Sequence, residues 1–370
     1  MRVASTSLAD FRCYESVQLD LPPGVTVVVG GNGAGKTSFL EALGWAALGR
    51  SFRGVPDAAL VRAGAQQAVL RVEIVTGAEP SERHRLVEAE VRAVGRNRVL
   101  LDRHPVARTR DLLGALRVTV FAPDDLVLVK GGPSGRRDYL DDLLVAAAPR
   151  YDAVRSDYER VVRHRNALLK GGVRDAEART TLEVFDEQLV EVGAELVTGR
   201  LRLLERLTPA VGTAYQALAG TSVAVDARYE AEWADGGAPA PGAIAEVMRG
   251  ALEARRRQEL ERKLTLVGPH RDEWRLRLAE FDSRTQASQG EQRTLALAMR
   301  LAGHRVCAEV LDDEPVLLLD DVFSELDAER SDALVAELPA GQTLITTAGA
   351  VPDAVHPERR VRVVDGRVEA

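Results

Sequence analysis

The chain has 370 residues, of which 45% are hydrophobic and 28% charged, and its formal net charge is -7. This length suffices for two domains with separate cores, and the acidic balance argues against a protein that coats DNA through a uniformly basic surface. The sequence has neither a long apolar run nor an apolar leader, so it predicts no membrane span and no export, and we expect a cytoplasmic protein. The two cysteines, Cys13 and Cys307, are predicted to be small buried hydrophobes in a reducing compartment.

The first part of the chain, to about residue 125, contains short β-type runs. Residues 25–29 are continuously apolar, which is typical of a strand buried on both faces. A glycine-rich segment and a predicted helix at 37–48 follow. Alternating polar and apolar residues at 68–74 and 86–94 predict antiparallel strands beside the main sheet.

The glycine-rich segment fits the phosphate-binding pattern G-x-x-x-x-G-K-[ST] without a gap. Its glycines let backbone N–H groups turn toward phosphates, and the following helix adds its positive end. We predict that Lys36 reaches the β- and γ-phosphates of ATP and that Thr37 places its hydroxyl on Mg²⁺. An ordinary glycine turn before a helix is the alternative. The predicted nucleotide-binding residues are Gly30, Gly31, Asn32, Gly33, Ala34, Gly35, Lys36, Thr37 and Ser38.

The middle of the chain, from about 134 to 263, has helical periodicity. Apolar residues at three- and four-residue steps predict a helix from 175 to 207, roughly 50 Å long, that ends before Pro209. Helices at 155–169 and 244–263 are expected to pack against it, with a strand at 223–233. Two basic groups are candidate DNA contacts, although a solvated helix face is the more common explanation of such runs. They are Arg136 and Arg137, and Arg255, Arg256 and Arg257.

A second set of motifs lies near the end of the chain. Ser288, Gln289 and Gly290 precede a predicted helix at 291–306, where a hydroxyl and free N–H groups form a seat for an anion. A serine that simply caps the helix is the alternative.

An apolar strand at 316–319 then ends in two acids. We predict that Asp320 holds Mg²⁺ and that Asp321 activates the water that attacks the γ-phosphate, unless the pair only caps the next turn. Asp327 is predicted to lie against a partner's site, to cap a helix, or both. Strands are expected at 343–347 and 361–364.

Within one chain, the anion seat at Ser288 has no phosphate to bind, because the phosphate loop occupies its own side of the site. Two chains placed face to face would put each Ser288 on the γ-phosphate held by the other. The sequence therefore predicts an ATP-dependent homodimer. The fold class is α/β, an ABC-type P-loop ATPase head with a mixed sheet and flanking helices, whose halves at 1–130 and 264–370 are interrupted by a mostly helical arm at 131–263.

These motifs resemble the ABC-type ATPase heads of the SMC group, and four further strings resemble the RecF family of bacterial recombination mediators. The resemblance covers the whole head, and the helical insertion matches in size and position. The strings are Asp-Phe-Arg-Cys-Tyr at 10–14, Gly-Arg-Ser-Phe-Arg at 49–53, Phe-Ala-Pro-Asp-Asp-Leu at 121–126 and Leu-Val-Gly-Pro-His-Arg-Asp-Glu at 266–273.

The resemblance implies an ATP-binding, DNA-binding protein of DNA replication, recombination, repair and the SOS response, associated with the nucleoid. It implies a dimer that recognises single- and double-stranded DNA at gaps or junctions and works with RecR and RecO to load RecA. Carried over by position, Lys36 and Asp321 are catalytic, Thr37 and Asp320 hold Mg²⁺, and Ser288 acts in trans.

Two departures from the general ABC pattern predict weak ATP hydrolysis, which a DNA-binding ATPase of this family is expected to show with stimulation by DNA. Residues 121–125 stand where a metal-sensing glutamine is expected, and Thr346 and Thr347 stand where transporter heads have a switch histidine. A non-hydrolysing SMC-like scaffold and the ATPase subunit of a transporter are the alternatives. Two roles remain open for His270: it links the insertion to the nucleotide site, or it caps the preceding strand.

Overall fold

The apolar strand predicted at 25–29 forms and lies inside a six-stranded sheet. The neighbours on both sides of β3 run parallel to it, and its central residues are buried, which explains why the run is continuously apolar. In order across the sheet, the strands are β15 (Arg367–Glu369), β14 (Arg359–Val364), β3 (Val25–Val29), β13 (Thr343–Thr347), β12 (Val316–Leu319) and β8 (Val118–Phe121).

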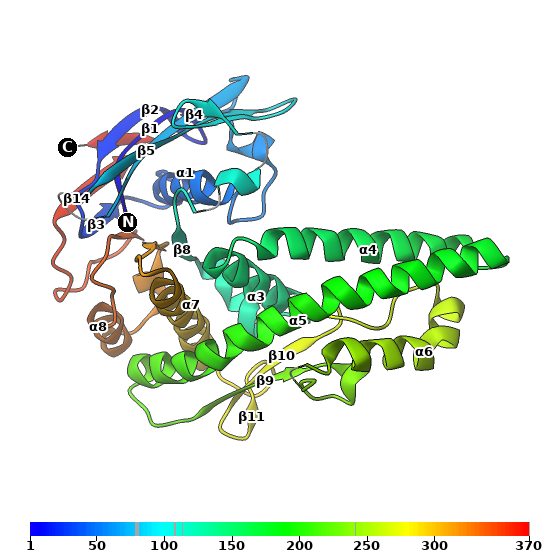
Figure 1. The fold of residues 1–370 in the computed structure, drawn as a ribbon. Coiled ribbons are helices and arrows are strands. Elements are labelled where there is room, and N and C mark those ends of the chain that lie inside the picture. Colours follow the sequence, from blue (N-terminus) through cyan, green and yellow to red (C-terminus); the bar gives the residue numbers. More distant parts are fainter. Residues whose placement is uncertain (78–80, 107–108, 113, 241, 370) are drawn as a thin grey trace. The chain divides into compact units, whose positions relative to one another are not determined.

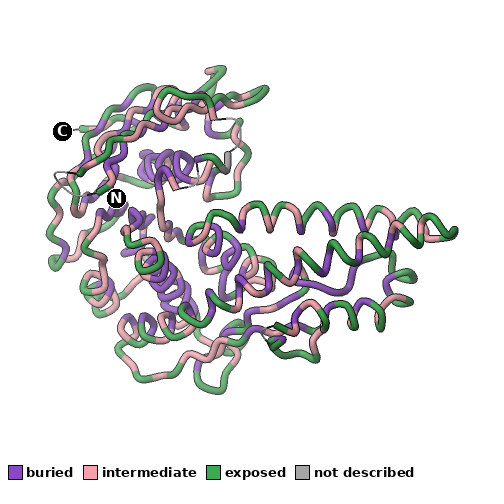
Figure 2. The backbone as a smooth tube through the Cα atoms, in the orientation of Figure 1, coloured by how far each residue is buried: buried purple, intermediate pink, exposed green. Residues whose placement is uncertain are grey.

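A second sheet of six strands is entirely antiparallel and contains the alternating segments predicted at 68–74 and 86–94. Helix α1 (Lys36–Leu48) contacts strands of both sheets, so it is apolar on nearly all sides and buried along most of its length (Figure 2). The strands are β2 (Tyr14–Asp20), β1 (Arg2–Phe11), β4 (Gln67–Thr76), β5 (Arg83–Arg92), β6 (Arg98–Leu101) and β7 (His104–Pro105).

The structure is a computed structural model that describes all residues except 78–80, 107–108, 113, 241 and 370. The chain divides into two compact units (Figure 1). Unit 1 contains the two sheets above with α1, most of α7 (Gln289–Leu311) and α8 (Ala328–Ala336). It consists of Met1–Leu126, Thr213–Ser222 and Arg293–Ala370, and unit 2 consists of Val127–Gly212 and Val223–Gln292.

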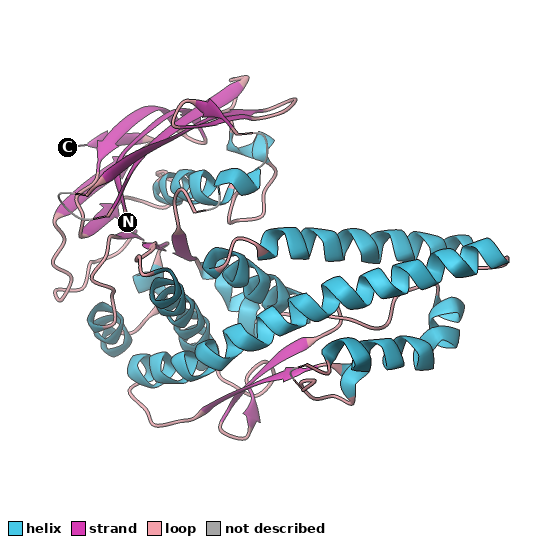
Figure 3. Cartoon of the chain, in the orientation of Figure 1, coloured by secondary structure: helices cyan, strands magenta, loops and turns pink. Residues whose placement is uncertain are grey.

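The second unit is mostly helical and carries one small sheet (Figure 3). Residues 264–292 belong to this unit because β10 pairs with β9 along its whole length, whereas the sequence placed them with the C-terminal half of the head. Its elements are α2 (Val127–Lys130), α3 (Pro133–Ala147), α4 (Tyr151–Gly171), α5 (Ala176–Ala219, to Gly212 in this unit), β9 (Val225–Glu230), α6 (Ile244–Arg262), β10 (Glu273–Leu278) and β11 (Phe281–Asp282).

Helix α5 is longer than predicted, because it continues through Pro209 to Ala219. Proline removes one helical hydrogen bond and disfavours a helix interior by about 3 kcal/mol. Pro209 lies on the exposed side of the helix, while Leu207 and Val211 on either side of it are fully buried. Packing of these neighbours therefore outweighs the local preference, and the predicted helix end at 207 was wrong.

Helices α4, α5 and α6 are joined by a buried cluster of charges. Arg165 in α4 is fully buried, donates to Asp186 of α5 at 2.8 Å and to Glu259 of α6 at 2.5 Å, and donates to Thr265 at 2.9 Å. Close approach of the three helices is possible at Gly193 of α5, where an added Cβ would lie 2.7 Å from a Met248 atom. None of the helices in the described part of the chain is both long and apolar enough for a bilayer crossing.

We predict that Arg165→Met destabilises unit 2 by about 3–5 kcal/mol, because it leaves the buried carboxylate of Glu259 without its cationic partner. Urea unfolding followed by circular dichroism measures the change. Arg257→Met is the control, since its i,i+4 pair with Glu261 is exposed and should change the stability little. Equal losses of stability in both variants would show that the buried cluster contributes no more to stability than an exposed ion pair.

Candidate nucleotide-binding site

The phosphate loop begins directly after β3 and ends at the first residue of α1, as the motif requires. Two of its glycines have no room for a side chain. A Cβ on Gly30 would lie 2.3 Å from the carbonyl oxygen of Val363, and one on Gly35 would lie 2.6 Å from Cys13 Sγ. Gly35 also has φ of +121°, which disfavours any other residue.

The side chain of Lys36 folds over the loop. Its Nζ donates to the carbonyl oxygens of Gly30 at 2.8 Å and Gly31 at 2.9 Å, and its side chain is buried. Tyr14 also holds the loop in place, because its hydroxyl donates to the Gly35 carbonyl at 3.0 Å. The ammonium group therefore lies against the same short stretch of backbone whose N–H groups are predicted to face phosphates.

Two distant parts of unit 1 meet at Asp320, which directly follows β12. Its Oδ1 accepts hydrogen bonds from Thr37 Oγ1 at 2.9 Å and from Thr346 Oγ1 at 2.7 Å. Burial raises the pKa of this carboxyl group, the two threonine hydrogen bonds lower it, Asp321 raises it, and the charge of Arg53 lowers it. The predicted pair of metal ligands, Thr37 and Asp320, is thus in direct contact.

Asp321 is held by its backbone in a left-handed conformation with φ of +49°. Its N–H donates to Thr346 Oγ1 at 2.9 Å, and its carboxylate accepts from the N–H of Ala348 at 3.3 Å. One threonine hydroxyl therefore bonds both acids, by donating to Asp320 and accepting from Asp321. This position on β13 is the one where the sequence lacked a switch histidine.

Arg53 was not among the predicted site residues, although it closes the string at 49–53. Its charge acts on Asp320, and its side chain is exposed. The backbone N–H of Arg53 donates to Ser51 Oγ, which in turn donates to the fully buried Glu41. Arg12 also donates twice to Glu41, at 2.8 Å each, so the 49–53 segment is fixed to α1 and to the first hairpin.

Residues 121–125 comprise the last residue of β8 and the tight turn that follows it. The carboxylate of Asp125 accepts from the N–H of Ala122 at 2.9 Å and from Arg300 of α7 at 2.5 Å, and the N–H of Asp320 donates to the Phe121 carbonyl. The turn is therefore tied both to the acidic strand and to α7. Of the cysteines, Cys307 is buried as predicted, but Cys13 is exposed beside the phosphate loop, so that prediction was wrong.

The serine motif belongs to unit 2 and has the geometry of a helix cap. Ser288 Oγ accepts from the N–H of Glu291 at 3.3 Å, and the Glu291 carboxylate accepts from Ser288 N at 2.8 Å and Oγ at 2.7 Å. This reciprocal arrangement is a capping box, and it leaves Ser288 and Gln289 exposed and Gly290 half-buried. Asp327 caps α8 by accepting from Arg330 N at 2.9 Å, as its alternative interpretation predicted.

The candidate DNA-binding arginines differ in their surroundings. Arg136 is buried, pairs with Glu273 at 2.8 Å and donates to three backbone carbonyls, so it is withdrawn as a DNA contact. Arg137 donates to the Asp272 carbonyl, and burial lowers its pKa. Arg255 donates to the Glu232 carbonyl, while Arg256 pairs with Asp186 and Arg257 with Glu261.

The strand, phosphate loop, helix and acidic strand define a P-loop ATPase head of the SMC type. A protein-family profile described as RecF/RecN/SMC N terminal domain matches residues 2–348. The fold is shared with a solved Smc head bound to the C-winged helix domain of ScpA, at a TM-score of 0.58 and 17% identity, covering 100% of this chain and 96% of that one.

Individual relatives identify the family within this class. The DNA replication and repair protein RecF of Frankia alni is 48% identical over 94% of this chain and 93% of its own length. A solved structure described as the recombination mediator protein RecF-ATP in the RecFOR pathway has a TM-score of 0.89 and 28% identity, covering 99% of this chain and 96% of that one. The chain therefore belongs to the RecF family.

We predict that Thr346→Val lowers the free energy of unfolding by about 1–3 kcal/mol at neutral pH, because Asp320 and the N–H of Asp321 lose one shared partner. The folded-state pKa of Asp320 is already raised, so the charged form is the costly one and the loss should shrink as Asp320 becomes protonated in acid. Urea titrations at several pH values measure this trend.

Thr347→Val is the matched control, because the hydrogen bond described for the Thr347 hydroxyl is one that it accepts from Gly349 N and that involves neither acid. An equal loss in both variants, or a loss in Thr346→Val that does not change with pH, would argue against the bridging role.

Proposed function

We propose that this chain is an ATP-dependent recombination mediator of DNA repair and replication restart, with slow, DNA-stimulated ATP hydrolysis. The observation that carries the proposal is the contact between Thr37 Oγ1 and Asp320 Oδ1, 2.9 Å long and formed across 283 residues of sequence. A phosphate loop whose hydroxyl meets a strand-end carboxylate is the arrangement by which P-loop enzymes hold a nucleotide and its metal ion.

ATP is the proposed substrate, and the loop residues Gly30 to Ser38 would bind its phosphates. Their N–H groups and the N-terminus of α1 supply a positive field, and Lys36 adds a full charge. Arg53 is a further candidate, because its charge already acts at Asp320 from an exposed position. These donors match the charge that develops on a transferring phosphoryl group.

The oxygen atoms of Thr37 and Asp320 fit Mg²⁺, which prefers hard oxygen ligands. When bound, Mg²⁺ would neutralise charge on the phosphate oxygens. Asp321 is the proposed group that orients the attacking water and accepts its proton. Because Thr346 holds the backbone of Asp321 where transporter heads have a histidine, we expect slow turnover.

Dimerisation is proposed from the serine motif. Ser288 and Gln289 are exposed and Gly290 is half-buried at the start of the long helix α7, and a helix N-terminus with a hydroxyl is suited to a γ-phosphate held by a second copy. The partner's Asp327 loop is expected at the same interface. Membership of the RecF family supports action at gapped or junction DNA together with RecR, RecO and RecA, in the cytoplasm at the nucleoid.

Asp321→Asn tests the proposed activity. We expect single-turnover ATP hydrolysis to fall by roughly a hundredfold or more, with nucleotide binding retained, because the water loses its base while the loop is unchanged. Quench-flow measurements with and without gapped DNA give the rates, and light scattering should show a longer-lived ATP-bound dimer. Unaltered hydrolysis in this variant would favour a different base, and absence of hydrolysis in the unmodified protein would favour the scaffold function.

Ser288→Arg tests the dimer. The arginine should block association in ATP and Mg²⁺, so light scattering should report a particle near the 40.1 kDa of one chain, while monomer nucleotide binding persists. Ser288→Thr is the control, since it keeps both the hydroxyl and the helix cap and should dimerise normally. If Ser288→Arg dimerises like the control, the proposed role in trans is wrong.

A further inference from the structure

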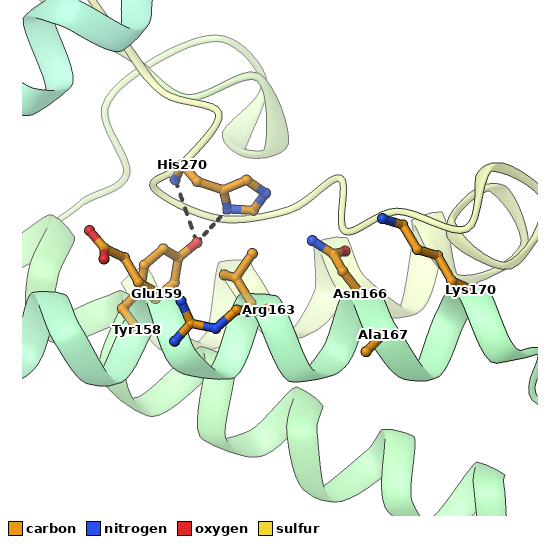
Figure 4. A pocket seen from close by; sticks show the side chains of 8 residues that line it. Tyr158, Glu159, Arg163, Asn166, Ala167, Lys170 and His270 are labelled. Carbon is orange, nitrogen blue, oxygen red and sulfur yellow. Dashed lines mark hydrogen bonds between the residues drawn. The ribbon is translucent and has the colours of Figure 1, made fainter. Parts of the chain in front are cut away.

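A groove lies within unit 2 between α4 and the segment 265–270, and its lining contains none of the predicted nucleotide-site residues (Figure 4). Its volume is about 500 Å³, within the range of ligand-binding sites. Val162 and Ala167 supply apolar surface, and Glu159, Arg163, Asn166 and Lys170 supply polar side chains.

One wall of the groove is fixed by hydrogen bonds. Asn166 Oδ1 accepts from Thr265 N at 2.7 Å and from Thr265 Oγ1 at 2.8 Å. His270 Nε2 bonds to the Thr265 carbonyl at 3.2 Å and therefore carries the proton, so Nδ1 accepts from the Tyr158 hydroxyl at 2.6 Å. Burial lowers the pKa of His270 to about 4, which keeps the ring neutral. His270 thus holds the wall against α4 within unit 2.

The two cationic side chains of the groove are not compensated by an acid. Arg163 and Lys170 are exposed, and among the described residues neither forms an ion pair. They lie about 10 Å apart along the helix axis, with Asn166 between them, and this spacing places all three near one face of α4. Asn166 uses its oxygen for Thr265, which leaves its amide N–H groups available. Glu159 is the one acid in the lining, and it pairs with Arg155.

The arginines on α6 contrast with this groove. Arg256 lies 2.5 Å from Asp186, and Arg257 lies 3.3 Å from Glu261, so each already has an acidic partner. A polyanion gains most from cations that it does not have to separate from a carboxylate. The uncompensated cations of α4 are therefore a better anion site than Arg256 and Arg257.

We propose that the α4 groove binds the phosphate backbone of DNA, with Arg163 and Lys170 on successive phosphates, the Asn166 amide on a phosphate or sugar oxygen, and Val162 against deoxyribose. This inference rests on the proposed function and assigns it a binding site. Contacts of this kind fix a protein on DNA without reading its sequence, which suits recognition of a gap or a junction rather than of a base order.

Fluorescence anisotropy with a labelled gapped duplex tests the groove. The double variant Arg163→Ala/Lys170→Ala should raise Kd roughly tenfold near physiological salt and reduce the slope of log K against log salt by about 1.4 to 1.8. Arg228→Ala/Arg257→Ala is the charge-matched control from the same unit, because both arginines are exposed and paired with acids, and it should bind like the unmodified protein. Circular dichroism and nucleotide binding should be unchanged in both.

Glu159→Gln adds a test that misfolding cannot imitate, since removal of the acid should tighten DNA binding severalfold. If the unmodified protein does not bind gapped, single-stranded or duplex DNA with or without ATP, the proposed function fails. If it binds but the groove variant keeps the same Kd and salt slope, or the control loses as much, the groove assignment is overturned. A groove variant that loses binding to poly-glutamate but not to DNA overturns it too, in favour of an acidic protein segment.

Discussion

The nucleotide site of the head is organised around one buried carboxylate. Asp320 is almost completely buried and accepts from Thr37 at the start of α1 and from Thr346 at the end of β13. A buried carboxylate without donors would cost several kcal/mol, so this pair of bonds can form only when the phosphate loop, β12 and β13 are in register. The same two hydroxyls therefore stabilise the fold and orient the groups proposed to meet a metal ion and a water molecule.

The parts of the fold that were predictable are those in which local pattern and burial agree. The strands β3, β12 and β13 were predicted at their observed bounds, because a short run of apolar and β-branched residues is typical of a strand buried on both faces. The end of α5 and the extent of unit 2 were not, because they depend on packing around Pro209 and on the pairing of β10 with β9. Apolar residues do continue at helical spacing beyond Pro209, and residues 273–278 do alternate, but these patterns do not show that packing outweighs the proline or which strand pairs with β10.

The residues of the candidate site also fall into a predictable group and an unpredictable one. A motif with fixed spacing identified the loop, and a strand end identified Asp320, so Thr37 and Asp320 were expected to meet. Arg53 was missed because its place is set by a chain of hydrogen bonds through Ser51 to the buried Glu41, which no spacing rule encodes. Arg136 was a wrong candidate for the converse reason, since charge pattern alone does not distinguish an arginine bonded to buried carbonyls from one on a solvated face.

Internal compensation of charge also explains how an acidic chain can have a site for a polyanion. In unit 2, Arg165 and Arg200 are fully buried and bonded to carboxylates, and Arg200 forms a bidentate pair with Asp141 at 2.7 and 2.8 Å. These arginines organise the helices and contribute little external field, because their partners cancel them at close range. The net charge of -7 is therefore a poor guide to local affinity. What matters for a phosphate is the small set of cations left without a partner, and their position is decided by which acids the folded helices bring to the other arginines.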